Sequence, residues 1–198
     1  MRIGLISDTH GLLRPQAMKQ LAGTDHIIHA GDIGGPEVVE GLRRVAPTTA
    51  IRGNIDVAEW SKGYPDTELV VLGGRAFYVL HNLKEIRLDP AACGFDVVVS
   101  GHSHRSKIET KNGVLYVNPG SAGPRRFKLP IAVAILALSD RVILPRILES
   151  SRSMSSPHAD LNCRRGGPSS SVLLTCPYAG FSANHRQRRL WIDRLGEK

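Results

Sequence analysis

Polar, ligand-type residues directly follow short apolar segments at several places in this chain, and this pattern restricts the fold most strongly. Asp32 comes after residues 27–30, and two glycines, Gly34 and Gly35, leave space for close approach of backbone or ligand. The same pattern occurs in Ser7-Asp8-Thr9-His10 and in Gly101-His102-Ser103-His104. Open α/β sheets carry their chemistry just beyond the carboxyl ends of their strands. The pattern predicts an α/β protein in which Asp32 is the central residue of a site.

Hydrophobic periodicity predicts alternating strands and helices at the start of the chain. Strands are expected at residues 2–7, 26–30 and 48–52, with helices beginning at Pro15 and Pro36 between them. This order gives a sheet that starts parallel. Later segments predict hairpins joining 68–72 to 76–80, 107–110 to 114–117 and 131–138 to 142–148, a strand at 96–100 and a short helix at 89–94. We expect two packed sheets flanked by helices.

The composition changes near residue 149. Residues 1–149 hold 18 Lys/Arg and 15 Asp/Glu, a net charge of +3, whereas residues 150–198 hold 8 and 3, a net charge of +5. The second part has Ser-, Arg- and Pro-containing stretches and only short apolar segments. We predict a domain at 1–149 and a flexible, basic C-terminal extension at 150–198. A solvated extension explains this charge, and binding to nucleic acid is the alternative.

Other sequence features restrict the cellular setting. The longest apolar run, residues 131–138, is far shorter than the roughly 20 residues of a membrane-spanning helix, so no membrane partner is expected. Cys93, Cys163 and Cys176 show no paired spacing, and the sequence begins with a strand-like segment rather than a secretory leader. These features predict a cytoplasmic protein.

Seven ligand-type side chains stand just beyond predicted strands. The full set is Asp8, His10, Asp32, Asn54, His81, His102 and His104. Taken singly, such an aspartate is commonly a turn residue and such a histidine commonly a hydrogen-bonded core or surface residue. Loops have no packing reason to supply all seven at strand ends. Two ions that share one carboxylate could use so many donors, so the joint pattern favours a binuclear metal centre.

The motifs around these residues occur in a definite order: Ser7-Asp8-Thr9-His10-Gly11, Gly31-Asp32, Gly53-Asn54-Ile55-Asp56, His81 and Gly101-His102-Ser103-His104. In order and spacing they resemble the calcineurin-like metallophosphoesterase superfamily. Asn118-Pro119-Gly120-Ser121 with Pro124-Arg125 makes residues 1–149 similar to its small YfcE-like phosphodiesterases. The resemblance implies the metallophosphoesterase fold, a four-layer α/β/β/α sandwich with two mixed β-sheets.

The resemblance also implies roles for individual residues. One divalent ion would be bound by Asp8, His10, Asp32 and His104, and a second by Asp32, Asn54, His81 and His102. Manganese is expected, and iron, zinc or nickel also suit mixed imidazole and carboxylate ligands. A hydroxide bridging the ions would attack phosphorus in line, with Asp32, Asn54 and Arg52 as catalytic residues. Arg52 and Asn54 would bind the substrate phosphate.

Three positions next to the implied ligands carry further expectations. Ile55 stands where many members of the superfamily have a histidine that protonates the leaving group, so the general acid is unassigned. Asp56 is then predicted to be a hydrogen-bond acceptor that fixes its loop. Asn82 follows His81 where relatives have glycine, and asparagine tolerates the positive φ expected there.

These observations predict a metal-dependent phosphodiesterase, a hydrolase that acts on a small phosphodiester. The alternative is that the fold serves as a protein-interaction scaffold, as in the small retromer subunit. That alternative needs a damaged metal site, and all seven ligand-type residues are present. The sequence favours the enzyme.

Overall fold

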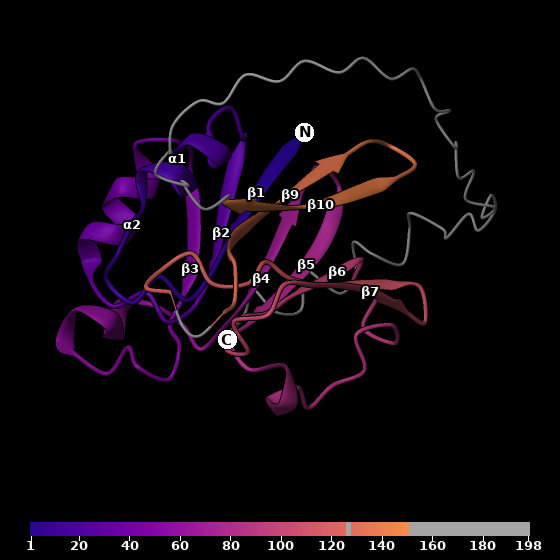
Figure 1. Ribbon diagram of the computed structural model, residues 1–198. Helices are drawn as coiled ribbons and strands as arrows, with labels where there is room; N and C mark the ends of the chain where they lie inside the picture. Colours follow the sequence, from indigo (N-terminus) through magenta and orange to yellow (C-terminus); the bar gives the residue numbers. More distant parts are fainter. Residues whose placement is uncertain (126–127, 151–198) are drawn as a thin grey trace, which may run out of the picture. The chain divides into compact units, whose positions relative to one another are not determined.

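The computed structural model describes residues 1–125 and 128–150, which form two five-stranded β-sheets packed face to face (Figure 1). The first sheet contains β1 (Arg2–Ile6), β2 (His26–Ala30), β3 (Thr48–Ile51), β9 (Ile131–Leu138) and β10 (Ile143–Ser150). The second contains β4 (Thr67–Leu72), β5 (Arg75–Leu80), β6 (Val97–Val99), β7 (Lys107–Lys111) and β8 (Val114–Asn118). The helical elements are α1 (Pro15–Leu21), α2 (Pro36–Arg43) and the 3-10 turns η1 (Glu59–Gly63) and η2 (Leu83–Glu85).

The first sheet has the strand order β10-β9-β1-β2-β3. Strands β1, β2 and β3 are parallel, which confirms the predicted start of the sheet. Strand β9 pairs antiparallel with β1, from Arg2 opposite Ala137 to Leu5 opposite Ala134. The last hairpin therefore places β1 in the middle of the sheet, so the loop after β1 lies between neighbouring loops.

The second sheet has the order β4-β5-β6-β8-β7 and is also mixed. Its two outer hairpins were predicted, and their tight turns have positive φ at both central residues: 56° and 73° at Gly73 and Gly74, and 49° and 79° at Asn112 and Gly113. Such turns match the twist of antiparallel strands. Strand β6 runs parallel to both β5 and β8, so its carboxyl end points the same way as theirs.

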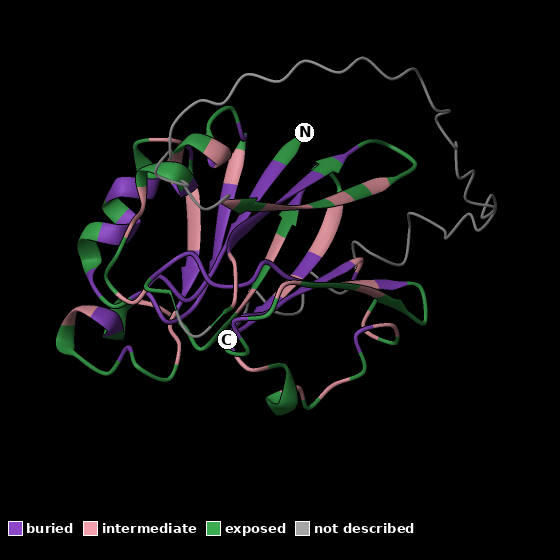
Figure 2. Ribbon diagram, viewed as in Figure 1, coloured by how far each residue is buried: buried purple, intermediate pink, exposed green. Residues whose placement is uncertain are grey.

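Apolar side chains fill the space between the sheets and beneath the helices. In Figure 2 the ribbons of β1, β2 and β9 are coloured mostly as buried. Ile3 and Leu5 of β1 meet Phe77 and Val99 of the second sheet in the central core. On the other face of the first sheet, α1 and α2 pack through a cluster that includes Leu21, Val39, Leu42, Ile27 and Ile135. Strand β1 contributes apolar side chains to both clusters, so both of its faces are buried. Moving this strand would expose apolar surface to water, which strongly favours its position in the sheet.

The outer face of the second sheet is covered by short helical turns rather than by a helix. Ile86 and Ala91 pack against Val98 there, and Tyr78 stacks on Phe95 at 5.3 Å between ring centroids. The helix predicted at 89–94 is wrong: the segment forms a turn only. Its cap is present, since Asp89 Oδ1 accepts a hydrogen bond from Ala91 N at 3.0 Å, but the chain must return at once to β6. This segment and η2 form the fourth layer of the sandwich.

The predicted extension at 150–198 lies, apart from residue 150, outside the described residues. Within the described part of the chain, no helix has the length and apolar character needed to cross a membrane.

Candidate metal centre

The seven predicted ligands stand at the carboxyl ends of five strands from both sheets. Asp8 and His10 follow β1, Asp32 follows β2 and Asn54 follows β3, whereas His81 follows β5 and His102 and His104 follow β6. Backbone hydrogen bonds join these ends: Asp8 N donates to Gly31 O and Gly101 N to His81 O. The structure brings all seven residues to one edge of the sandwich.

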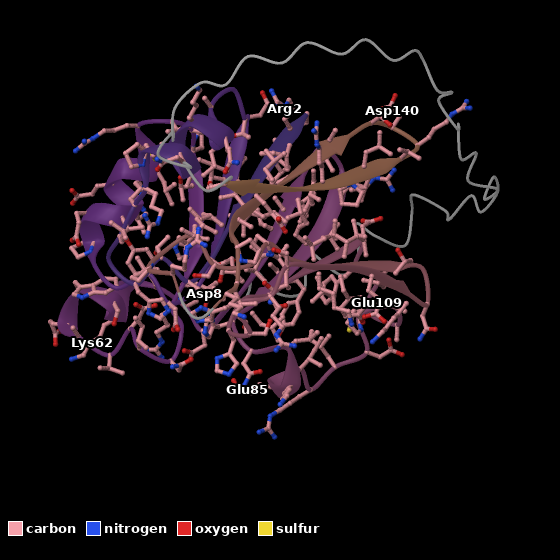
Figure 3. The ribbon with its side chains drawn as sticks, in the orientation of Figure 1. Arg2, Asp8, Lys62, Glu85, Glu109 and Asp140 are labelled. Atoms are coloured by element: carbon pink, nitrogen blue, oxygen red, sulfur yellow. The ribbon has the colours of Figure 1, made fainter. Side chains whose placement is uncertain are left out.

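Four of the residues converge on one point and are called the first cluster: Asp8, His10, Asp32 and His104. One potential ligand atom from each lies within 4.8 Å of all the others. His104 Nε2 is 3.2 Å from Asp8 Oδ1 and 3.5 Å from His10 Nε2. His10 Nε2 is 3.8 Å from Asp32 Oδ2. The site is built around buried Asp8, labelled in Figure 3.

The remaining residues form a second group around the other oxygen of Asp32. Asp32 Oδ1 lies 3.3 Å from His81 Nε2. The His81 ring meets the His102 ring edge-on at 5.2 Å between centroids, and His102 Nδ1 lies 3.0 Å from Asn54 Oδ1. Asp32 therefore has one carboxylate oxygen toward each set of donors.

The backbone of the site is strained at the ligands themselves. Six described residues other than glycine have positive φ, and five of them are predicted ligands: Asp8, His10, Asp32, His102 and His104. The left-handed conformation costs about 1 kcal/mol or more for each such residue. Packing elsewhere in the domain must offset this cost. The sequence carried no direct sign of this strain.

Glycines of the motifs are required by close packing between the loops. A Cβ atom at Gly101 would collide with Ser7 Oγ and approach Asp8 Oδ2, and one at Gly53 would collide with the Asp32 side chain and backbone. Neither glycine is among the residues with positive φ. Their role is to let adjacent strand ends approach within hydrogen-bonding distance.

Hydrogen bonds orient the two carboxylates. Asp8 Oδ2 accepts bonds from Ser7 Oγ at 2.6 Å and His102 N at 3.2 Å, which directs Oδ1 toward the first cluster. Asp32 Oδ1 accepts a bond from Ile55 N at 3.2 Å. Sequence reasoning assigned no role to Ser7, although it directly precedes Asp8 in the motif.

Asp56 ties together the loops after β2 and β3. Its buried carboxylate accepts three backbone hydrogen bonds, from Ile33 N at 2.9 Å, Gly34 N at 2.8 Å and Gly53 N at 2.8 Å. This confirms the prediction that Asp56 fixes its loop, and it keeps Asp32 beside Asn54.

A second support lies under the loop after β1. The fully buried His29 has its Nε2 2.8 Å from Thr9 Oγ1, and the Thr9 hydroxyl lies 2.9 Å from Ile33 O. The hydroxyl donates to this carbonyl, so His29 donates to the hydroxyl. Burial lowers the pKa of His29 to about 3, and the ring is therefore neutral.

The carboxylates and His81 have shifted pKa values. Burial raises the pKa of Asp8 to about 6, against the smaller opposing effect of its bond from Ser7. Burial would also raise the pKa of Asp32, but the His81 ring beside it holds that pKa below its ordinary value. Burial would lower the pKa of His81, yet its contacts with Asp32 and Ala30 O raise it. The shift of Asp8 comes mainly from burial, whereas the shifts of Asp32 and His81 depend on their contact with each other.

The residues present fit a divalent cation. Asp8 Oδ1 is buried and accepts no hydrogen bond from the described residues. His81 Nδ1 lies 2.8 Å from Ala30 O and carries a proton, which leaves Nε2, 3.3 Å from Asp32 Oδ1, as the ring atom that could bind a cation. A proton or a metal cation can occupy the position between these two atoms, and imidazole with carboxylate donors suits transition metals.

Two predicted details are changed by the structure. Asn82 has a φ of −104°, so the expected positive φ is wrong; its side chain instead accepts a hydrogen bond from Lys84 N and caps η2. Arg52 is paired with Asp66, with Nε–Oδ1 at 2.5 Å and Nη2–Oδ2 at 2.9 Å. This partner was not foreseen, and the contact of Arg52 with phosphate stays a prediction.

The fold and the first cluster define a metal-binding α/β sandwich. Comparison with known protein families identifies the class of this protein. Residues 1–141 match the family model of the calcineurin-like phosphoesterase superfamily domain, and the chain belongs to this superfamily. Its enzyme class is phosphoester hydrolase.

Individual relatives agree with this assignment. A probable metallophosphoesterase of Methanocaldococcus jannaschii is 31% identical over 151 residues, which are 72% of this chain and 78% of the relative. The solved structure of an archaeal phosphodiesterase is 25% identical with a TM-score of 0.63, and the match covers 75% of this chain and 100% of that one. The predicted family and fold are both confirmed.

The sandwich is also similar to Vps29 proteins. Vps29 of Chaetomium thermophilum has a TM-score of 0.62 and 16% identity, with 76% of this chain and 95% of that one covered. At this level of identity the likeness shows the fold alone.

Proposed function

We propose that this protein is a two-metal phosphodiesterase in which Asp32 bridges the two ions. The placement of Asp32 is the observation that carries the proposal. Its Oδ2 is directed toward His10 in the first cluster, and its Oδ1 is directed toward His81 in the second group. A single carboxylate between two sets of nitrogen and oxygen donors is what a shared ligand requires.

The first cluster would hold one ion, and the second group with Asp32 would hold the other. When bound, two divalent ions would activate a water for in-line attack on phosphorus and offset the negative charge of the phosphate. Manganese is our first choice, and iron, zinc or nickel would also suit a set of three oxygen and four imidazole donors.

The charge of the donor set favours an anionic substrate. Asp8 and Asp32 are the only carboxylates among the seven donors, so they offset two of the four positive charges of two divalent ions. Asn54 is neutral and preserves the remaining attraction for a phosphate. Arg52 would add a forked donor once its exposed pair with Asp66 opens, and exposed pairs contribute only about 0–1 kcal/mol.

The proton for the leaving group needs a source other than the residue at position 55. Ile55 has no proton to donate, and both carboxylate oxygens of neighbouring Asp56 are bound to backbone N–H groups. We propose that solvent supplies the proton or that the leaving group departs without one. Substrates with an acidic leaving group meet this condition.

Replacing Asp32 tests the function directly. Asp32→Asn removes the shared charge, so we expect bound manganese to drop and hydrolysis of bis(p-nitrophenyl) phosphate to fall by at least about 1000-fold. Metal content and turnover are measured on the same preparation. Asp140→Asn is the matched control, since Asp140 lies in an exposed turn well separated from Asp8 (Figure 3). Full activity of Asp32→Asn would contradict the bridging role.

The interaction scaffold is the second candidate, and the fold shared with Vps29 supports it. The enzyme is favoured because all seven ligand-type residues lie together at one edge of the sandwich. Turnover with manganese, compared with a chelator-treated sample, separates the two: hydrolysis of no phosphodiester or phosphomonoester would support the scaffold. A cytoplasmic location and nucleic-acid binding through the extension remain predictions from the sequence.

A further inference from the structure

The rim of the site beside the first cluster is positively charged. It is formed by three loops, residues 9–14, 101–106 and 118–125, which carry Arg14, Arg105 and Arg125 and contain no Asp or Glu. These loops touch one another: Asn118 Nδ2 donates to Gly101 O at 2.6 Å, and Ser121 Oγ donates to Asp8 O at 3.0 Å. The rim is therefore a continuous surface next to the candidate metal ligands.

Arg14 is held in place within this rim. It is half-buried, and its Nε donates to Gly123 O at 3.0 Å. Gly123 N in turn donates to Asp8 O at 3.2 Å, and a Cβ atom at Gly123 would collide with the Asp8 and Thr9 carbonyls. One residue thus separates the Arg14 guanidinium from the backbone of Asp8.

Arg14 also differs from other arginines in its partners. Arg52 is paired with Asp66 and Arg75 with Asp96, whereas no carboxylate pairs with Arg14 among the described residues. A half-buried guanidinium loses part of its hydration, and without a counter-ion no ion pair compensates for this loss. Its two terminal nitrogens form no hydrogen bond with the described residues, so they can bind an anion from outside the chain.

We propose that Arg14 binds a second phosphate group of the substrate, next to the phosphoester that is hydrolysed. This inference rests on the proposed function and names its substrate class: small phosphodiesters that carry an additional phosphate. A guanidinium held at Nε presents its remaining donors as a planar fork, which matches two phosphate oxygens.

The charge of the loops on the opposite side of the site supports binding of the second phosphate at the rim that carries Arg14. The loops at residues 52–66 and 81–89 contain five acidic residues and four basic ones, a net charge of −1, whereas the three loops of the rim carry three arginines and no acidic residue. A second phosphate would be attracted more strongly by the rim that carries Arg14 than by these nearly neutral loops. The additional phosphate therefore lies on the side of the first cluster.

Two synthetic substrates with the same leaving group test the proposal. They are thymidine 5′-(p-nitrophenyl phosphate) and its 3′-phosphorylated counterpart, assayed with manganese. We expect kcat/KM to be at least about tenfold higher for the 3′-phosphorylated compound, since one charged bidentate contact is worth about that factor. Arg14→Gln should bring the ratio close to one, and Arg14→Lys, which keeps the charge without the fork, should give an intermediate ratio.

Arg2→Gln is the matched control, because the Arg2 guanidinium also donates to a backbone carbonyl, that of Gly23, but lies at the far end of β1 (Figure 3). This control should keep the wild-type ratio. A wild-type ratio near one, or the same high ratio in Arg14→Gln, would overturn the proposal. Circular dichroism of each variant verifies folding.

A binding measurement separates this inference from the proposed function. Titration calorimetry on chelator-treated protein compares thymidine 3′,5′-bisphosphate with thymidine 5′-monophosphate. Tighter binding of the bisphosphate that is lost in Arg14→Gln supports the site even if neither substrate is hydrolysed, in which case only the proposed function fails. Equal binding of the two nucleotides by the wild type would refute the site whatever the turnover.

Discussion

At the scale of single residues, the candidate ligands combine two costly properties. Asp8 is fully buried and has a φ of 55°, so both its charge and its backbone are unfavourable in isolation. Hydrogen bonds from Ser7 Oγ and His102 N satisfy one oxygen and leave the other facing His104. A cation beside this carboxylate would therefore stabilise its anionic form.

The raised pKa of Asp8 makes metal binding depend on pH. The pKa is about 6 in the folded protein against 3.8 for an unperturbed aspartate, so without metal the folded state binds the proton more tightly than the unfolded state between these values. Asp8 alone therefore destabilises the metal-free protein by about 3 kcal/mol as pH rises through this window. Metal must displace this proton below about pH 6.

We accordingly expect the apparent affinity for manganese to fall about tenfold per pH unit below pH 6 through this group. Calorimetric titrations at pH 7.5, 6 and 5 measure it. Asp8→Asn should bind manganese weakly and lose the part of the pH dependence that comes from this carboxyl. An affinity that stays constant down to pH 5 in the wild type would contradict the assignment of Asp8 as a ligand.

Asp56 is the second residue with a measurable contribution. Asp56→Ala leaves the N–H groups of Ile33, Gly34 and Gly53 without their acceptor. We expect the free energy of unfolding to fall by about 2–4 kcal/mol, and metal affinity to fall with it. Urea denaturation followed by circular dichroism measures the first quantity. Asp140→Ala should change it by less than about 0.5 kcal/mol, and a similar result for Asp56→Ala would disprove the role of the three bonds.

At the scale of elements, the site depends on how closely strand ends approach one another. The loops after β1, β2, β3 and β6 are in direct contact, and glycine is the only residue that fits where two of them meet. Gly101 packs on Ser7 and Asp8, and Gly53 packs on Asp32. Gly53 and Gly101 thus determine the distance between ligands rather than the shape of a turn.

A pair of glycine substitutions tests this packing. Gly101→Ala places a methyl group against Ser7 Oγ and Ala30 O, so we expect a loss of about 1–3 kcal/mol in unfolding free energy and weaker metal binding. At Gly63 in η1 a Cβ atom would meet nothing within 4 Å, and φ there is not positive. Gly63→Ala is therefore the control and should be neutral or slightly stabilising. Equal stability of the two variants would contradict the packing argument.

At the scale of the whole molecule, the candidate ligands connect the two sheets. Asp8, His10, Asp32 and Asn54 follow strands of the first sheet, whereas His81, His102 and His104 follow strands of the second. A bound ion would therefore join the sheets at the edge where the strands end, in addition to the apolar contacts of the core.

Metal should consequently stabilise the fold. At a concentration 100 times the dissociation constant, a ligand that binds only the folded state adds about 2.7 kcal/mol. We expect the midpoint of thermal unfolding to rise by several degrees with manganese and to fall after chelation, as measured by calorimetry. Asp32→Asn should show a much smaller shift, and an equal shift in both proteins would place the stabilising metal elsewhere.

The sequence by itself determined the strands, both packed sheets and the seven ligand-type residues. Apolar periodicity marks buried strands, and polar residues beyond strand ends have few structural reasons to occur together. The predicted helix at 89–94 failed because its cap signals describe one turn equally well, and only the return of the chain to β6 limits its length.

Only the tertiary structure decided which strand lies beside which and what each ligand faces. The pairing of β9 with β1 joins residues 129 to 135 positions apart, and no local pattern encodes such a contact. The same holds for the left-handed backbone at Asp8 and Asp32, for Arg52 with Asp66, and for Arg14 beside Gly123. The physical reason is common to all: these features arise from packing between segments distant in the chain, whereas the sequence pattern reports the burial of each segment by itself.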